Sequence, residues 1–310
     1  MRHHYVPKFL LRQWSFEDEK RQRKIPAFYW DARFGRLRRF AGGADAFCNQ
    51  DALWELAGSH PDGRDALETN FFKKIDTSAA RIVRKLTVRP QQKLTAQERF
   101  DFVVFLLSLE ARRPRVVSLI KKQGSDFYRE GFDTDQEITT LLRKSGSNET
   151  VSAAFERLSG APIVDHALLL LQQLSQNERI VRKVSKYRWG TVHLAADQGK
   201  FVLGDRPLVR INATDNEQNL WALPLSPTTA FFASSTSDVE ASLKSRSVKQ
   251  IRNLLNSDSA MQCDRYVFCS EANNLDWLER RLRYADRQPG PEMISSLRPS
   301  ASGDFSSRLP

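Results

Sequence analysis

Apolar residues that recur every three or four positions, with basic residues between them, predict a long amphipathic helix over residues 65–87. At about 100° per residue, one stripe of this helix is apolar and consists of Leu67, Phe71, Ile75, Ala79, Ile82 and Leu86. The other side is basic and carries Lys73, Lys74, Arg81, Arg84 and Lys85. Glu68 lies near the middle of the apolar stripe, where a carboxylate is costly unless a partner neutralises it.

A second helix is predicted to begin at Thr95, because Thr95 and Glu98 have the spacing of a capping box. Its body, residues 100–109, is apolar almost all round, which is typical of a helix at the centre of a fold. Glu110 faces inward, and Arg113 lies within about 60° of it on the helix surface. Further helices are predicted over residues 115–130, 134–144, 149–158, 163–186, 239–257 and 275–284.

Short apolar runs bounded by turn residues predict strands at both ends of the chain. Residues 25–30 and 36–40 have the pattern of a hairpin, as do residues 188–194 and 201–203. Three more strands are expected at residues 220–224, 230–233 and 265–269. The fold class is therefore α+β, with a mainly helical core and a small antiparallel sheet formed from the N-terminal hairpin and the C-terminal strands.

The order of these elements predicts a single compact α+β domain over residues 1–285. It can be divided into a helical part, residues 65–186, and a sheet-containing part, residues 1–60 with 187–285. Residues 286–310 are rich in Pro, Ser and Gly, and we expect them to form a flexible tail.

The net charge narrows the class of partner. Lys and Arg total 48 against 37 acidic residues, a net charge of +11, which favours polyanions because neutralised phosphates release counterions. We therefore expect nucleic acid as a partner or substrate. No apolar run reaches the length of a membrane span, and the start has no apolar signal segment, so we expect a cytoplasmic protein without membrane contact. The three cysteines form no CxxC pair and are expected to be reduced.

Several motifs with known chemistry are absent from the sequence. There is no phosphate-binding Gly-x-x-x-x-Gly-Lys loop, no Gly-x-Gly-x-x-Gly, no His-Glu-x-x-His and no Gly-x-Ser-x-Gly. Nucleotide hydrolysis through a P-loop, dinucleotide redox chemistry and serine hydrolysis thereby lose their usual support.

A scattered polar set remains as the candidate site. His3 and His4 precede Pro7, whose rigid backbone can hold an imidazole in place. Glu68, Glu110 and Asp205 offer hard oxygen ligands for Mg²⁺ or Mn²⁺. The competing interpretation is structural. In it, Glu68 and Glu110 neutralise buried arginines such as Arg12 and Arg113, while Asp205, two residues before Pro207, caps a turn.

The opening His-His-Tyr-Val-Pro-x-Phe-Leu-Leu-Arg-x-Trp resembles the N-terminal signature of a mostly bacterial family, domain of unknown function 4238. The same order of shorter motifs follows: Leu67-Glu68, Asp76, Glu110 to Pro114, Tyr187-Arg188-Trp189, Asp205-Arg206-Pro207, Pro224 to Pro227 and Asn256. The chain departs from the family at Asp76, where Glu is more frequent, and at Glu110, where Gln is frequent. The resemblance covers residues 3–270, implies one shared fold, and singles out His4, Glu68, Arg113 and Asp205 as a set.

These observations give three hypotheses. The first is a metal-dependent nuclease or phosphodiesterase, acting in phage defence or as a toxin. His4 would be a ligand or general base, Glu68, Glu110 and Asp205 would hold the metal, and Arg113 would clamp the phosphate. The residues expected to bind its substrate are Arg12, Lys73, Arg81, Arg84 and Arg206.

The second hypothesis is a non-catalytic nucleic-acid-binding or regulatory protein in which the same polar set is a buried structural network. Its basic helix faces would contact phosphates, and Trp14, Trp30 and Trp189 would stack on bases. The third is a metal-free enzyme for a nucleotide or another small anion, bound by Arg12, Arg113 and Arg206. Each is compatible with a protein partner or a homo-oligomer.

Overall fold

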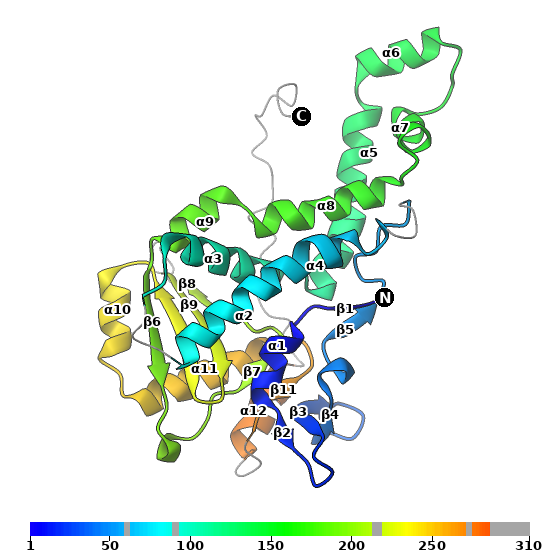
Figure 1. Ribbon diagram of the computed structural model, residues 1–310. Helices are drawn as coiled ribbons and strands as arrows, with labels where there is room; N and C mark the ends of the chain where they lie inside the picture. Colours follow the sequence, from blue (N-terminus) through cyan, green and yellow to red (C-terminus); the bar gives the residue numbers. More distant parts are fainter. Residues whose placement is uncertain (59–62, 89–92, 213–218, 271–274, 286–310) are drawn as a thin grey trace.

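Helices and antiparallel sheets surround one central helix, α3 (Ala96–Ala111) (Figure 1). The computed structural model describes residues 1–58, 63–88, 93–212, 219–270 and 275–285. The segment predicted as a flexible tail, residues 286–310, lies outside them. The expected α+β class, mainly helical, is confirmed.

The two strongest helix predictions are confirmed with small changes. The first helix begins as a π-helix, η4 (Leu67–Phe72), and continues as α2 (Lys73–Val88). Its apolar stripe is buried at Leu67, Phe71, Ala79, Ile82 and Leu86. In α3 the capping box is present, because the Thr95 side chain accepts the Glu98 N–H and the Glu98 side chain accepts the Thr95 N–H.

The other helices follow the predicted order with different breaks. Residues 163–186 form two helices, because the Asn177 side chain accepts the N–H of Ile180 and starts a new helix there. Residues 239–257 are likewise divided, by a capping box of Ser247 and Gln250. The bounds are α1 (Lys8–Leu11), α4 (Pro114–Leu119), η5 (Ile120–Gly124), α5 (Ser125–Asp133), α6 (Gln136–Lys144), α7 (Val151–Ser159), α8 (Ile163–Ser175), α9 (Glu178–Ser185), α10 (Ser237–Lys244), α11 (Val248–Gln262) and α12 (Asp276–Ala285).

A four-stranded antiparallel sheet lies between two helical layers (Figure 1). Its order is β6 (Arg188–His193), β10 (Thr229–Ser234), β9 (Asn219–Ser226) and β8 (Val209–Asn212). Phe231 packs with Phe102 of α3 on one face, and Phe232 packs with Ile251 and Leu255 of α11 on the other. The predicted hairpin of residues 188–194 and 201–203 is wrong: β6 pairs with β10, and Leu203 pairs elsewhere.

The N-terminal hairpin is confirmed as β3 (Arg23–Asp31) and β4 (Arg36–Gly42). Gly35 in its turn has φ +58°, a conformation that residues with a Cβ rarely adopt. As predicted, C-terminal strands complete this sheet: β11 (Val267–Phe268) pairs with both β3 and β7 (Leu203–Gly204), and β2 (Phe16–Glu17) pairs with the start of β3. A third sheet joins β1 (Arg2–His4) to β5 (Asn49–Asp51), so the single small sheet that we expected underestimates the β content.

The largest buried cluster combines side chains from the N-terminal strands, α2, α3, α9 and the C-terminal sheet. Val6, Ile25, Phe102, Leu223 and Phe268 all belong to it. Trp14 is buried in the same cluster, and its indole N–H donates to the carbonyl of Phe201. The three cysteines are free, as expected. Over the described residues, no helix combines the length and the apolar composition needed to cross a bilayer.

Candidate functional site

A buried carboxylate between two arginines forms the centre of the candidate site. Glu110, at the end of α3, is 1% exposed. Its Oε2 lies 3.4 Å from an Nη of Arg113 and 3.5 Å from an Nη of Arg206. The inward direction expected for Glu110 is therefore confirmed, and its partner Arg113 is the one that the structural interpretation named. Both contacts involve Oε2, and Oε1 is buried without a hydrogen-bond partner among the described residues. Two guanidiniums beside the carboxylate neutralise its charge, and their own positive charge disfavours a metal ion there.

Asp205 lies next to this centre and accepts hydrogen bonds from three consecutive backbone N–H groups. Its Oδ1 accepts from Asp264, and its Oδ2 accepts from Arg265 and Tyr266, at 2.8 to 2.9 Å. Burial, together with the negative charge of Asp264, raises the pKa of Asp205 to about 7, while the three N–H groups oppose that rise. The preceding Gly204 permits this packing, since a Cβ there would lie 2.7 Å from the carbonyl oxygen of Ser259.

Asp264 connects Asp205 to the Glu110–arginine group. Both of its carboxylate oxygens lie 3.2 Å from Arg113, and its side chain is 44% exposed, so the otherwise buried network reaches solvent here. The structure thus brings together Glu110, Arg113, Asp205 and Arg206, which the sequence had suggested, with Asp264, which it had not. Nothing in the local pattern marks Asp264, because its partners lie 59 and 151 positions away along the chain.

Glu68 belongs to a different polar group, around Arg112. The Arg112 side chain is 1% exposed, forms two hydrogen bonds with Asp76 and lies over the Phe72 ring. Burial raises the pKa of Glu68, and the nearby charge of Arg112 opposes this. Within the described residues, Glu68 Oε2 is buried without a hydrogen-bond donor. The consecutive residues Arg112 and Arg113, which connect α3 to α4, therefore belong to two separate networks.

The two histidines of β1 differ in role. His3 is fully buried and stacked on Trp54; its Nδ1 accepts the N–H of Trp54, so Nε2 carries the proton and bonds to Asp65 at 2.8 Å. Such a ring is structural. His4 is 8% exposed, and its Nε2 lies 3.7 Å from Asp45, too far for a hydrogen bond. Burial, with help from Lys8, lowers the pKa of His4 to about 4, so its imidazole is neutral at pH 7.

The predicted metal ligands Glu68, Glu110 and Asp205 do not fit one shared ion. Glu110 faces two guanidiniums, Asp205 uses both oxygens on backbone N–H groups, and Glu68 lies in the Arg112 group. Across the ranges that the structure describes, no three His, Cys, Asp or Glu side chains are grouped closely enough to hold a metal.

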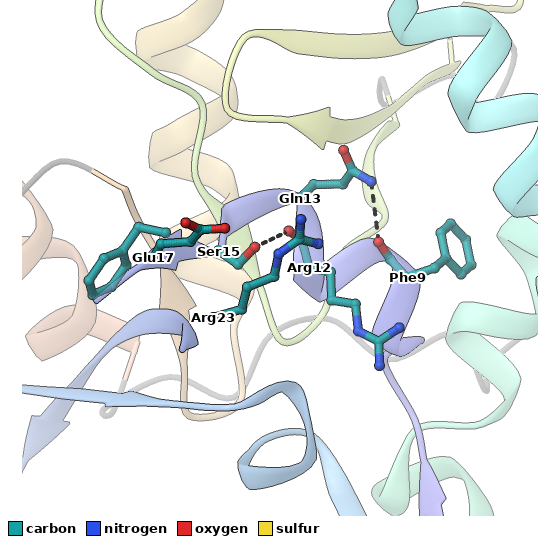
Figure 2. Close-up of a pocket in the computed structure, with 7 residues that line it drawn as sticks. Phe9, Arg12, Gln13, Ser15, Glu17 and Arg23 are labelled. Atoms are coloured by element: carbon teal, nitrogen blue, oxygen red, sulfur yellow. Dashed lines mark hydrogen bonds between the residues drawn. The ribbon is translucent and has the colours of Figure 1, made fainter. Parts of the chain in front are cut away.

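Arg12, a predicted substrate-binding residue, lines a surface hollow of about 540 Å³ beside η1 (Arg12–Trp14) and β2. Arg23, Ser15 and Glu17 line it too (Figure 2). Figure 2 shows the guanidinium groups of Arg12 and Arg23 pointing in different directions. The hollow also contains the opposite charge of Glu17, so these two arginines do not form a single clamp on one anion.

Comparison with known proteins assigns the chain to a family. Residues 2–273 match the model of a family described as a protein of unknown function, DUF4238. The chain belongs to the DUF4238 family. The resemblance expected from the opening motif is thereby confirmed over nearly the same range. No curated protein and no solved structure matches the chain.

The basic residues predicted on α2 of this DUF4238 protein lie on its exposed face. Lys73, Lys74, Arg81 and Arg84 are exposed, and none of them makes an ion pair with another described residue. Lys85, by contrast, pairs with Glu98 of α3. Of the three tryptophans expected to stack on bases, Trp14 is 1% exposed and Trp189 packs edge-on against Phe102 and Phe231. Trp30 is partly buried against the cluster that contains Phe28.

Proposed function

We propose that this DUF4238 protein binds nucleic acid through the exposed face of α2, and that the Glu110 network fixes the fold. The observation that supports this is the set of four unpaired cations, Lys73, Lys74, Arg81 and Arg84. By helical angle these side chains occupy one stripe about 100° wide, and Thr77 and Val88 are its other exposed members. The stripe contains no carboxylate, because Asp76 points toward Arg112.

The length of the stripe suits a phosphate backbone. Lys73 and Arg84 are eleven positions apart, which corresponds to about 16 Å along a helix axis. Phosphates of one strand of a duplex are about 3.4 Å apart along its axis, so the stripe spans several consecutive phosphates. The remaining surplus of the +11 net charge strengthens the attraction at long range.

The test is a binding assay with a charge-matched control. One variant carries Lys73→Gln, Lys74→Gln, Arg81→Gln and Arg84→Gln. The control carries Arg143→Gln, Lys144→Gln, Lys249→Gln and Arg280→Gln, which are also exposed and likewise make no ion pair with a described residue. With fluorescently labelled DNA and RNA, the α2 variant is expected to lose about tenfold or more in affinity and the control far less. Equal losses in both variants, or a wild type that binds neither polymer, would contradict the proposal.

Phosphodiester cleavage is the second candidate function, and Glu68 favours it. The Glu68 carboxyl is buried, and the negative charges of Asp76 and Asp65 contribute to its raised pKa. Its Oε2 is buried without a hydrogen-bond partner among the described residues, and the residue lies in the π-helix η4. Raised carboxyl pKa values and π-helical turns both concentrate at functional sites. Purified wild type and Glu68→Gln would be incubated with DNA and RNA in Mg²⁺, Mn²⁺ or EDTA. Cutting that the folded variant loses supports cleavage; no cutting under any condition rules this candidate out and leaves binding.

A further inference from the structure

The β3–β4 hairpin carries exposed aromatic rings beside arginines on one face. Arg36, Arg38 and Phe40 alternate along β4 and therefore share a face. Their partners on β3 are Asp31, Tyr29 and Ala27, which share the same face because paired residues point to the same side. Phe34, in the turn, is 61% exposed, and Phe40 is 49% exposed. Two exposed rings on one small hairpin, close to several arginines, make this surface a candidate contact site.

Arginines are already placed against these rings. The guanidinium carbons of Arg38 and Arg36 lie 4.8 Å and 5.5 Å from the centre of the Phe34 ring. Arg265, which is exposed, lies 4.9 Å from the Tyr266 ring and 5.8 Å from the Tyr29 ring. Tyr29 and Tyr266 touch edge to face at 5.9 Å. Aromatic rings and guanidiniums therefore adjoin each other across β4, β3 and the start of β11.

The rings are anchored from below, so the face is ordered without a ligand. Phe40 and Tyr266 both pack edge-on against Phe47, which is 1% exposed. The opposite face of the same sheet is covered by α12, through Phe28, Leu278 and Leu282. The inner part of the ring-bearing face is also buried, because Ala27 and Phe268 on it are 0% exposed and belong to the main core cluster. Only the outer part, toward β4 and the turn, presents rings to solvent.

The charge of the whole hairpin suits a polyanion. Residues 23–42 contain six Lys and Arg residues and a single acid, Asp31, which pairs with Arg38. An apolar partner would not need this charge, and a basic partner would be repelled by it. Proteins bind single strands with exposed rings and arginines, since each nucleotide has a base whose flat face can stack on a ring and a phosphate that can pair with a guanidinium.

We propose that the exposed outer part of this face, formed by β4, the β3–β4 turn and Arg265 just before β11, binds single-stranded nucleic acid. Phe34 and Phe40 stack on unpaired bases, while Arg36, Arg38 and Arg265 contact the phosphates. A duplex keeps its bases stacked on one another and cannot use the rings. This inference rests on the proposed function, because α2 supplies phosphate contacts for either form and the hairpin face adds a preference for single strands.

The test compares single strands with duplexes in variants of the rings. Labelled DNA and RNA strands of about 12 nucleotides, a length typical of such sites, would be measured beside the duplex of the same sequence. Phe34→Ala with Phe40→Ala is expected to weaken single-strand binding about tenfold or more and to leave duplex binding unchanged. Phe34→Tyr with Phe40→Tyr keeps the rings and is expected to keep the affinity. Phe127→Ala on α5, another exposed ring, serves as the control.

Different failures have different meanings. If the double alanine variant, folded by its melting temperature, binds single strands as tightly as wild type, the hairpin face is not the site and duplex binding by α2 is unaffected. If wild type binds no nucleic acid at all, the proposed function fails. If the variant instead changes the sedimentation of the protein, β4 is an interface between copies of the chain, because it is an edge strand that pairs only with β3 among the described strands.

Discussion

At the scale of single residues, Glu110 is the side chain on which two buried arginines depend. Replacing it by Gln leaves Arg113 and Arg206, 5% and 6% exposed, without their shared carboxylate. Breaking one partner out of a buried ion pair costs about 3–5 kcal/mol of unfolding free energy. We expect urea unfolding of Glu110→Gln to show a loss of that order. Glu178→Gln, which breaks the exposed pair with Arg182, is expected to cost less than about 1 kcal/mol. Similar losses for the two variants would show that the Glu110 network is not a structural centre.

Two other buried groups should make stability depend on pH in opposite directions. The pKa of Asp205 is raised from 3.8 to about 7, so its stabilising contribution to the unfolding free energy is present below about pH 4 and is lost as pH rises toward 7. The pKa of His4 is lowered from 6.5 to about 4, so its stabilising contribution to the unfolding free energy is present above about pH 6.5 and is lost as pH falls toward 4. Each amounts to a change on the order of 3–4 kcal/mol, and the two offset each other in the wild type.

Single substitutions should separate the two opposite changes of unfolding free energy with pH. Between pH 4 and 7, His4→Gln removes the rising contribution, so its unfolding free energy is expected to fall with pH more steeply than that of wild type. Asp205→Asn removes the falling contribution, and its unfolding free energy is expected to rise with pH relative to wild type. Chemical unfolding at several pH values measures both slopes. Parallel curves for the three proteins would mean that neither group titrates in this window.

At the scale of elements, the sequence predicted what depends on neighbours along the chain and missed what depends on distant partners. The capping box at Thr95 and the apolar stripe of α2 were predictable because their residues lie within a few positions of each other. The partner of β6 was not, because β10 begins 36 residues after the end of β6. The division of residues 163–186 is an intermediate case. Asn177 is a common capping residue, but the apolar period continues across it.

The Asn177 cap provides a test of that division. Its side-chain oxygen accepts the N–H of Ile180 at the start of α9. Asn177→Ala removes this bond and is expected to lower the unfolding free energy by about 1 kcal/mol. Gln173→Ala, an exposed change within α8, is expected to have little effect and is the control. If the two variants unfold alike, the cap does not determine where α9 begins.

At the scale of the whole molecule, the candidate site illustrates what a single sequence lacks. Inward-facing Glu110 and nearby Arg113 were predictable from helical angle, since Arg113 follows the end of α3 by only two residues. The sequence suggested Arg206 as a candidate without showing that it pairs with Glu110, and it did not suggest Asp264, because both residues reach the site through turns far along the chain. The choice between a metal site and an ion-pair network therefore required the three-dimensional arrangement.

The salt dependence of binding is a property of the whole charged molecule, and it separates contact from general attraction. Each phosphate neutralised in contact releases counterions, and for duplex DNA the slope of log K against log salt changes by about 0.9 per contact. The α2 variant lacks four cations in the contact stripe, Lys73, Lys74, Arg81 and Arg84, and its slope should be shallower by about 3–4. The control variant at Arg143, Lys144, Lys249 and Arg280 has the same net charge, so its slope should stay near that of wild type. Anisotropy titrations over a series of salt concentrations measure all three slopes. If both variants became shallower to the same extent, the attraction would come from net charge alone, and α2 would not be the contact surface.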